Sequence, residues 1–187
     1  MSTANLSELV IAAQQMIADA QATFGPLTAP QLNWKPSAEQ WSIGQCFDHL
    51  RATKEPYFSI IARVLDGTKQ DTFWEKLPFW PGFLGKQFIK AMLPTSTRKV
   101  KTRPLFAPST SAVDSQIIQT FIAQERRWIE AIQRTATIDS AKVIITSPVA
   151  AVVTYSLLDA MRLASVHERR HFQQAERVMR MSPFPLP

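Results

Sequence analysis

Apolar residues recur every three or four positions along four long stretches of this chain, and this spacing constrains the fold more than any other feature. The stretches run from about 2 to 24, 42 to 66, 112 to 134 and 156 to 181. Such a period puts the apolar side chains on one face of a helix, which must pack against another element. The sequence therefore predicts an all-α fold, a four-helix bundle with a long crossover connection between helices two and three.

Local signals set some of the helix ends. Ser42 is predicted to cap the second helix, with Gln45 completing a capping box, and the Asp-Gly pair at 66–67 is predicted to end it. Residues 139–155 form a short apolar connection that could hold an extended segment, but Pro148 argues against a central strand there.

A single domain over residues 1–187 is predicted, with an irregular aromatic and basic insertion at 68–111. Within it, residues 71–94 are rich in large aromatic side chains, and 82–93 could form a short helix. The aromatic part could be a satellite of the core, a contact between subunits, or a cover over a substrate pocket. A homodimer is expected because bundles with aromatic surface segments commonly dimerise.

Charge and composition narrow the class of partner. The net charge is +6, but the one local cluster of cations, at 97–103, has no interleaved aromatics, so no nucleic-acid partner is predicted. No apolar stretch approaches the roughly 18 to 20 residues that span a bilayer, so no membrane partner is predicted either. The first twenty residues lack the pattern of a secretory signal, and we expect a cytoplasmic protein.

Histidine is rare in this chain, and its three copies are His49, His167 and His171. The last two are four residues apart, which places them on the same face of a helix with Cβ atoms about 5–6 Å apart. They fall on a predicted inward seam formed by Ala160, Ala164, His167, His171, Gln174 and Val178. The three imidazoles could bind one metal ion, or each could be a hydrogen-bonded residue of the core.

Neighbouring residues have two interpretations each. Cys46, the only cysteine, could approach the metal or be a small apolar core residue. Gln174 could hydrogen-bond a metal-bound water. Glu168 and Asp48 could each accept a hydrogen bond from a ligand histidine, or be exposed helix residues. Arg169 and Arg170 could bind a substrate anion, or a carboxylate of a neighbouring helix.

Two blocks of this sequence resemble the DinB-like family. "LNWKPSAEQWSIGQCFDHL" at 32–50 is similar to the family's N-terminal signature, and 147–179 is similar to its final helix, with two histidines four apart. The resemblance implies a four-helix bundle in which His49, His167 and His171 bind a divalent metal, often zinc, nickel or iron, with water at the fourth position. Members often carry an acidic residue shortly after His-Leu; here Glu55 comes six residues after His49 and is not predicted as a ligand.

This resemblance implies a metal-dependent enzyme acting on a small molecule, of the thiol-transferase or hydrolase type. A transferase would use a low-molecular-weight thiol as a second cofactor. Two alternatives stay open: a non-catalytic metal- or ligand-binding stress-response module, and an interaction protein whose histidines merely pack. The fold cannot choose among them, because function depends on the site.

Overall fold

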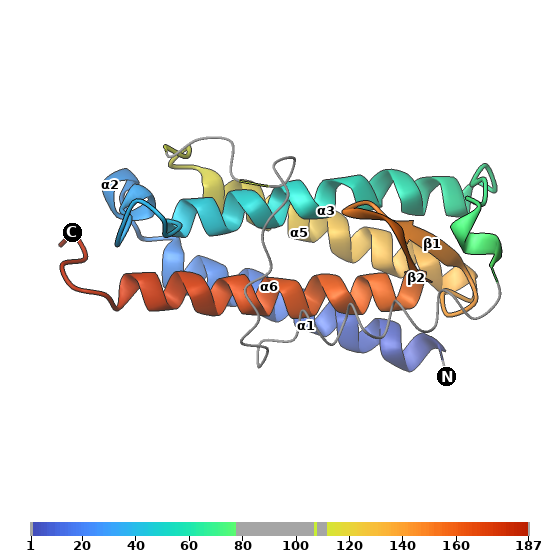
Figure 1. The fold of residues 1–187 in the computed structure, drawn as a ribbon. Helices are drawn as coiled ribbons and strands as arrows, with labels where there is room; N and C mark the ends of the chain where they lie inside the picture. The colour runs from blue at the N-terminus through green and yellow to red at the C-terminus, as the bar shows by residue number, and fades with distance from the viewer. Residues whose placement is uncertain (1, 78–106, 108–111, 187) are drawn as a thin grey trace.

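The computed structural model describes residues 2–77, 107 and 112–186, and it is mostly helical, as predicted (Figure 1). Four long helices lie side by side: α1 (Ser2–Phe24), α3 (Ile43–Leu65), α5 (Ile117–Arg134) and α6 (Leu157–Met179). α1 packs against α5 and α6, and α3 packs against the same two helices. The apolar face of each helix is therefore covered by two neighbours.

The directions of the helices define the main connection. α3 and α5 run the same way along the molecule, whereas α1 and α6 run the opposite way (Figure 1). The chain must therefore return from the end of α3 to the start of α5, over residues 66–116. This arrangement agrees with the long connection predicted between the second and third helices.

Both ends of α3 match the sequence signals. The Ser42 hydroxyl accepts a hydrogen bond from the backbone N–H of Gln45 at 3.1 Å, and the Gln45 side-chain oxygen accepts one from the backbone N–H of Ser42 at 3.1 Å. This reciprocal pair satisfies two of the donors that a helix N-terminus leaves open. At the other end Asp66 is the C-cap, and Gly67 adopts a φ of 74°, which glycine reaches without steric penalty.

A small sheet, absent from the all-α prediction, precedes α6. β1 (Ile144–Ser147) and β2 (Ala150–Ser156) form an antiparallel hairpin in which Ile145 lies opposite Tyr155. The segment could hold an extended stretch, as predicted, and it forms strands because β-branched residues dominate it and Pro148 lies in the turn, where its missing N–H removes no ladder bond.

Two further boundaries differ from the prediction. The short helix α2 (Ala29–Asn33) lies outside the four predicted helical stretches, and it begins with a capping box between Thr28 and Gln31. α5 begins at Ile117, several residues after the predicted start near 112. Both differences concern single turns of helix, which apolar periodicity cannot resolve.

The buried apolar residues form two clusters, one toward each end of the long helices. The hairpin-end cluster is formed by Leu6, Leu9, Ala13, Tyr57, Ile61, Trp128, Ala131, Ile132, Ile145, Tyr155, Leu157, Leu158, Ala160, Met161 and Leu163. The α2-end cluster is formed by Met16, Ala20, Phe24, Leu32, Ile43, Cys46, Phe47, Leu50, Ile117, Ile118, Phe121, Ile122, Phe172, Ala175 and Val178. Polar residues occupy the middle of the core between them.

Three of these polar residues form a buried charged layer, which we define as Lys54 on α3, Glu125 on α5 and Glu168 on α6. Their exposed fractions are 3%, 0% and 3%, and the Lys54 ammonium pairs with both carboxylates. Burial, followed by the neighbouring Glu168 charge, raises the pKa of Glu125 to about 8, and Lys54 opposes this rise. The interpretation of Glu168 as an exposed helix residue is therefore wrong.

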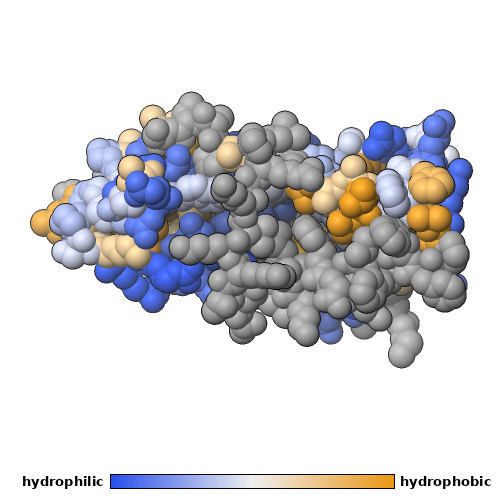
Figure 2. Space-filling model, in the orientation of Figure 1, coloured by the Kyte–Doolittle hydropathy of each residue, from blue (hydrophilic) through white to orange (hydrophobic). Residues whose placement is uncertain are grey.

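No helix in the described ranges is long and apolar enough to cross a membrane. Figure 2 shows hydrophobic residues at the end of the molecule where Figure 1 places the hairpin. The exposed large apolar residues include Phe73, just before the one-turn helix η1 (Trp74–Lys76), and Val152 in β2. The predicted helix at 82–93 and most of the aromatic segment at 71–94 lie outside the described residues.

Candidate metal centre

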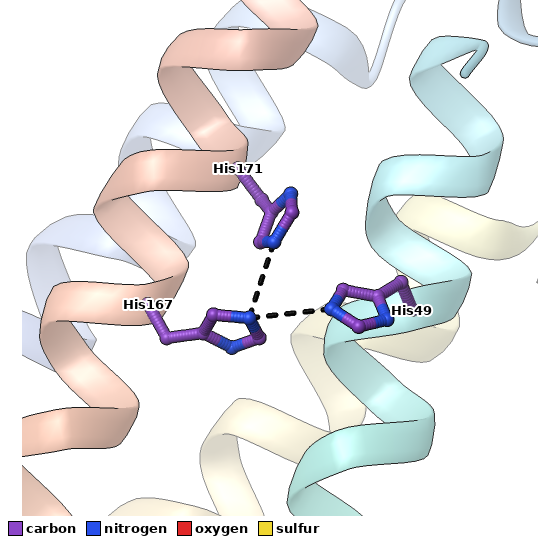
Figure 3. A group of neighbouring side chains, drawn as sticks. All are labelled: His49, His167 and His171. Carbon is purple, nitrogen blue, oxygen red and sulfur yellow. Dashed lines mark hydrogen bonds between the residues drawn. The ribbon is translucent and has the colours of Figure 1, made fainter. Parts of the chain in front are cut away.

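The three histidines meet between α3 and α6. His49 projects from α3, and His167 and His171 project from α6 toward it (Figure 3). The Nε2 atom of His167 lies 3.2 Å from Nε2 of His49 and 3.1 Å from Nε2 of His171. One ligand atom from each ring lies within 4.8 Å of the other two, so the three rings could hold one ion.

Sequence spacing and helix packing both contribute to this arrangement. The interval between His167 and His171 places both rings on the side of α6 that packs against α3. His49 reaches the same point from the facing helix, where it is 5% exposed, and the other two rings are partly buried. The sequence predicted the pair on one helix, and the structure brings the third histidine to it across 118 residues.

Hydrogen bonds among the three histidines cannot satisfy all of the ring nitrogens that meet here. His171 Nδ1 lies 3.0 Å from the side-chain oxygen of Gln174, which only accepts, so Nδ1 carries the proton and Nε2 carries a lone pair. His167 Nε2 faces two nitrogens but has one proton or one lone pair to offer, so it can match only one of them. A cation would instead accept a lone pair from each of the three nitrogens.

The spacing of the nitrogens also fits a metal ion. Zinc–nitrogen bonds of about 2.0–2.1 Å in a tetrahedron place the nitrogens about 3.3 Å apart. The two measured separations, 3.2 Å and 3.1 Å, are close to this value. Among the described residues, no cysteine or carboxylate joins the group, so the candidate ligand set is three histidines.

The environment keeps two of these rings uncharged. Burial, followed by repulsion from His171 and His49, lowers the pKa of His167 well below its ordinary value. Burial, followed by repulsion from His49, lowers the pKa of His171 to about 3, against a smaller opposing effect of Gln174. Metal binding requires the neutral imidazole, so both rings are ready to bind at neutral pH.

The metal-free protein is expected to lose stability in mild acid. In the unfolded chain a histidine titrates near pH 6.5, whereas His167 and His171 resist protonation in the fold. The contribution of these two rings to the free energy of unfolding is therefore complete above about pH 6.5. It falls by about 1.4 kcal/mol per pH unit for each ring as the pH drops toward the pKa values of the folded state. Urea unfolding in EDTA at about pH 7.5 and about pH 5.5 measures this loss.

A variant carrying His167→Phe and His171→Leu is the control for this pH dependence. Glu125 acts in the opposite direction, because its raised pKa lowers stability as the pH rises from about 4.5 to about 8. Both proteins keep Glu125, so the difference between their pH profiles isolates the histidines. Equal profiles would contradict the expectation.

Trp41 and Gln174 contact the histidine rings. The indole of Trp41 stacks on His171 at 5.6 Å between ring centroids and 20° between planes, and it lies 4.9 Å from the ring of His49. Gln174, predicted as a partner of metal-bound water, contacts Nδ1 of His171. Trp41 was not predicted as a site residue; its position just before the helix cap was the available signal.

The other candidate residues have separate roles. Cys46 is fully buried in the α2-end cluster, and burial raises the pKa of its thiol to about 12, so it is the apolar core residue of the two interpretations. Oδ1 of Asp48 lies 3.8 Å from Nη1 of Arg51, and Nη1 of Arg169 lies 3.6 Å from Oδ2 of Asp19 on α1. Arg169 thus contacts a neighbouring helix's carboxylate, one of its two predicted partners.

Comparison with known proteins supports the sequence resemblance. A family model described as the DinB superfamily matches residues 12–175, which include all three histidines. Neither a search of curated proteins nor a search of solved structures found a match.

Proposed function

This chain belongs to the DinB superfamily, and from that premise we propose that it is a metal-dependent enzyme acting on a small molecule through an open three-histidine centre. The observation that carries the proposal is the convergence of three Nε2 atoms on one point. Zinc, nickel and iron are the proposed ions. Imidazole is a suitable ligand for all three, and the ligand geometry alone does not select among them.

Three protein ligands leave a coordination position for a reactant, as catalytic rather than structural zinc sites do. A divalent ion held by neutral ligands lowers the pKa of a water or thiol that binds to it. The chain's own residues would fix the ligand rings: the Gln174 side-chain oxygen accepts a hydrogen bond from Nδ1–H of His171, and the low pKa values keep His167 and His171 neutral.

Thiol transfer is the favoured reaction over hydrolysis. Hydrolysis by a bound water is commonly assisted by a carboxylate that acts as a general base. In the described part of the chain no carboxylate joins the histidines, and the buried Glu125 and Glu168 are paired with Lys54. A low-molecular-weight thiol brings its own nucleophile and needs only to lose its proton.

The proposal extends to the fold, the oligomeric state and the location of the protein. We propose that the four long helices form a four-helix bundle; its support is the packing of α1 and α3 against both α5 and α6. A homodimer, a cytoplasmic location and a small-molecule substrate complete the proposal.

Metal uptake and thiol transfer test the proposal in sequence. Metal-free protein is incubated with zinc, nickel or iron(II), separated from free ion, and analysed by plasma mass spectrometry, with about one ion per chain expected. The loaded and metal-free proteins are then compared for metal-dependent conjugation of thiols, such as cysteine and glutathione, to an electrophilic aromatic chloride. Absence of bound metal at any loading would refute the centre.

The two steps also separate the enzyme from the non-catalytic alternative. One ion per chain without conjugation of any thiol would favour a metal-binding module. Conjugation that appears only in the loaded protein would support the transferase.

A further inference from the structure

We propose that Trp41 is a positioning residue for the metal centre, holding His49 and His171 in the orientation that binds the ion. This inference rests on the proposed metal-binding function. It assigns a role to a side chain that contributes no ligand atom.

The geometry of Trp41 differs from that of an ordinary core residue. Its indole is nearly parallel to the His171 ring and tilted by 55° against the His49 ring, with both centroids within 5.6 Å. The two histidines come from different helices, α6 and α3, which the ion would have to hold together. One side chain therefore contacts a ligand on each side of the centre.

The local sequence fixes where Trp41 sits. It directly precedes Ser42, whose reciprocal hydrogen bonds with Gln45 set the path of the chain into α3. Its backbone is thus attached to the same helix that carries His49, two turns further on. The capping box places the indole over the histidines, and the indole in turn restricts how their rings can rotate.

His171 is constrained from two directions. Gln174 accepts from its Nδ1 at 3.0 Å, which sets the tautomer and directs Nε2 toward the other rings. The stacked indole covers one face of the same ring, so rotation about its bond to the chain would break both contacts. A ring held in this way keeps its lone pair directed at the ion before the ion arrives.

A purely structural role for Trp41 is the competing explanation. A hydrophobic residue before a helix cap often packs against the first turn, and Trp41 does pack against the α2-end cluster. Such a role would change the stability of the fold and leave the affinity and geometry of the metal centre unchanged. Trp34 offers a matched comparison, because it packs against the same cluster. Its ring centroid lies 5.5 Å from that of Phe184, and within the described part of the chain it makes no ring contact with a histidine.

Cobalt(II) is the probe for the test, because its visible absorption reports the arrangement of its ligands. Wild type, Trp41→Leu, Trp41→Phe and Trp34→Leu are titrated with cobalt(II) against a competing chelator, and their spectra are recorded. Trp41→Leu is expected to weaken binding about tenfold and to change the visible bands, as loss of a partner that orients a ligand does. Trp41→Phe restores an aromatic face and should stay within about threefold of wild type. Trp34→Leu should match wild type.

The outcomes separate the role of Trp41 from the proposed metal binding on which it depends. Wild-type affinity and spectrum in Trp41→Leu would overturn the role of Trp41 while leaving the metal centre intact. Failure of the wild-type chain to bind cobalt(II), zinc or nickel would overturn the centre itself, and the role of Trp41 with it. Where leucine prevents folding, Trp41→Met provides an apolar, non-aromatic side chain of more adaptable shape for the same comparison.

Discussion

Replacing His167 with alanine is expected to abolish specific binding of a divalent metal ion by this protein. Its Nε2 atom is the one that lies beside both other histidines, so its removal leaves two nitrogens that no longer surround a common point. Removing the partner that orients a ligand typically weakens metal binding 10- to 100-fold, and loss of a ligand itself should exceed about 100-fold. Isothermal titration with zinc, with a chelator as competitor, measures the change.

Thermal unfolding gives a second reading of the same variant. An ion at 100 times its dissociation constant stabilises the folded state by about 2.7 kcal/mol, and this gain should vanish in His167→Ala. Gln174→Leu is a graded control, because it keeps all three ligands and removes only the acceptor of His171 Nδ1. Unchanged metal affinity in His167→Ala would show that the ion, if bound, lies elsewhere.

Lys54→Met is expected to destabilise the protein by about 3–5 kcal/mol, the range found when one partner of a buried ion pair is removed. The ammonium of Lys54 is the common partner of Glu125 and Glu168, and without it the negative charge of this layer would stay buried with no counter-ion. For a protein of this size the melting temperature should fall on the order of 10 °C. Urea unfolding of the metal-free protein gives the free energy directly.

Lys142→Met is the matched control for this substitution. Lys142 also pairs with a carboxylate, that of Asp139 at 3.2 Å, but both side chains are largely exposed. A surface pair contributes about 0–1 kcal/mol, so the control should barely change stability. Adding Glu125→Gln and Glu168→Gln to Lys54→Met should recover much of the loss, because no unpaired charge then remains buried. A loss no larger in Lys54→Met than in the control would contradict the role assigned to the charged layer.

Features encoded within one helix could be predicted from the sequence. The ends of α1 and the capping box of α3 follow from residues a few positions apart, and the structure shows both as predicted. The pair formed by His167 and His171 depends only on the pitch of a helix. The meeting of His49 with that pair also depends on how α3 packs against α6, and it was predicted from a resemblance to a family rather than from spacing.

Features that depend on several elements at once were missed. Glu125 stands within the apolar stripe of α5, which was a visible sign of a buried charge, but nothing in its own helix identifies Lys54 as its partner. The hairpin was missed for a different reason. Pro148 disfavours a strand only where it must donate a ladder bond, and the position of the turn decides whether it must.

The division of the core into two apolar clusters has a consequence for how the helices are aligned along their axes. Leucine, isoleucine and phenylalanine side chains pack acceptably after a helix slides by one turn, about 5.4 Å, because apolar contacts are not directional. Sliding α6 along α3 by that amount would carry Glu168 away from Lys54 and into one of the apolar clusters, at a desolvation penalty of several kcal/mol. The charged layer thus fixes the register of α6 on α3. In that register His49 lies opposite His167.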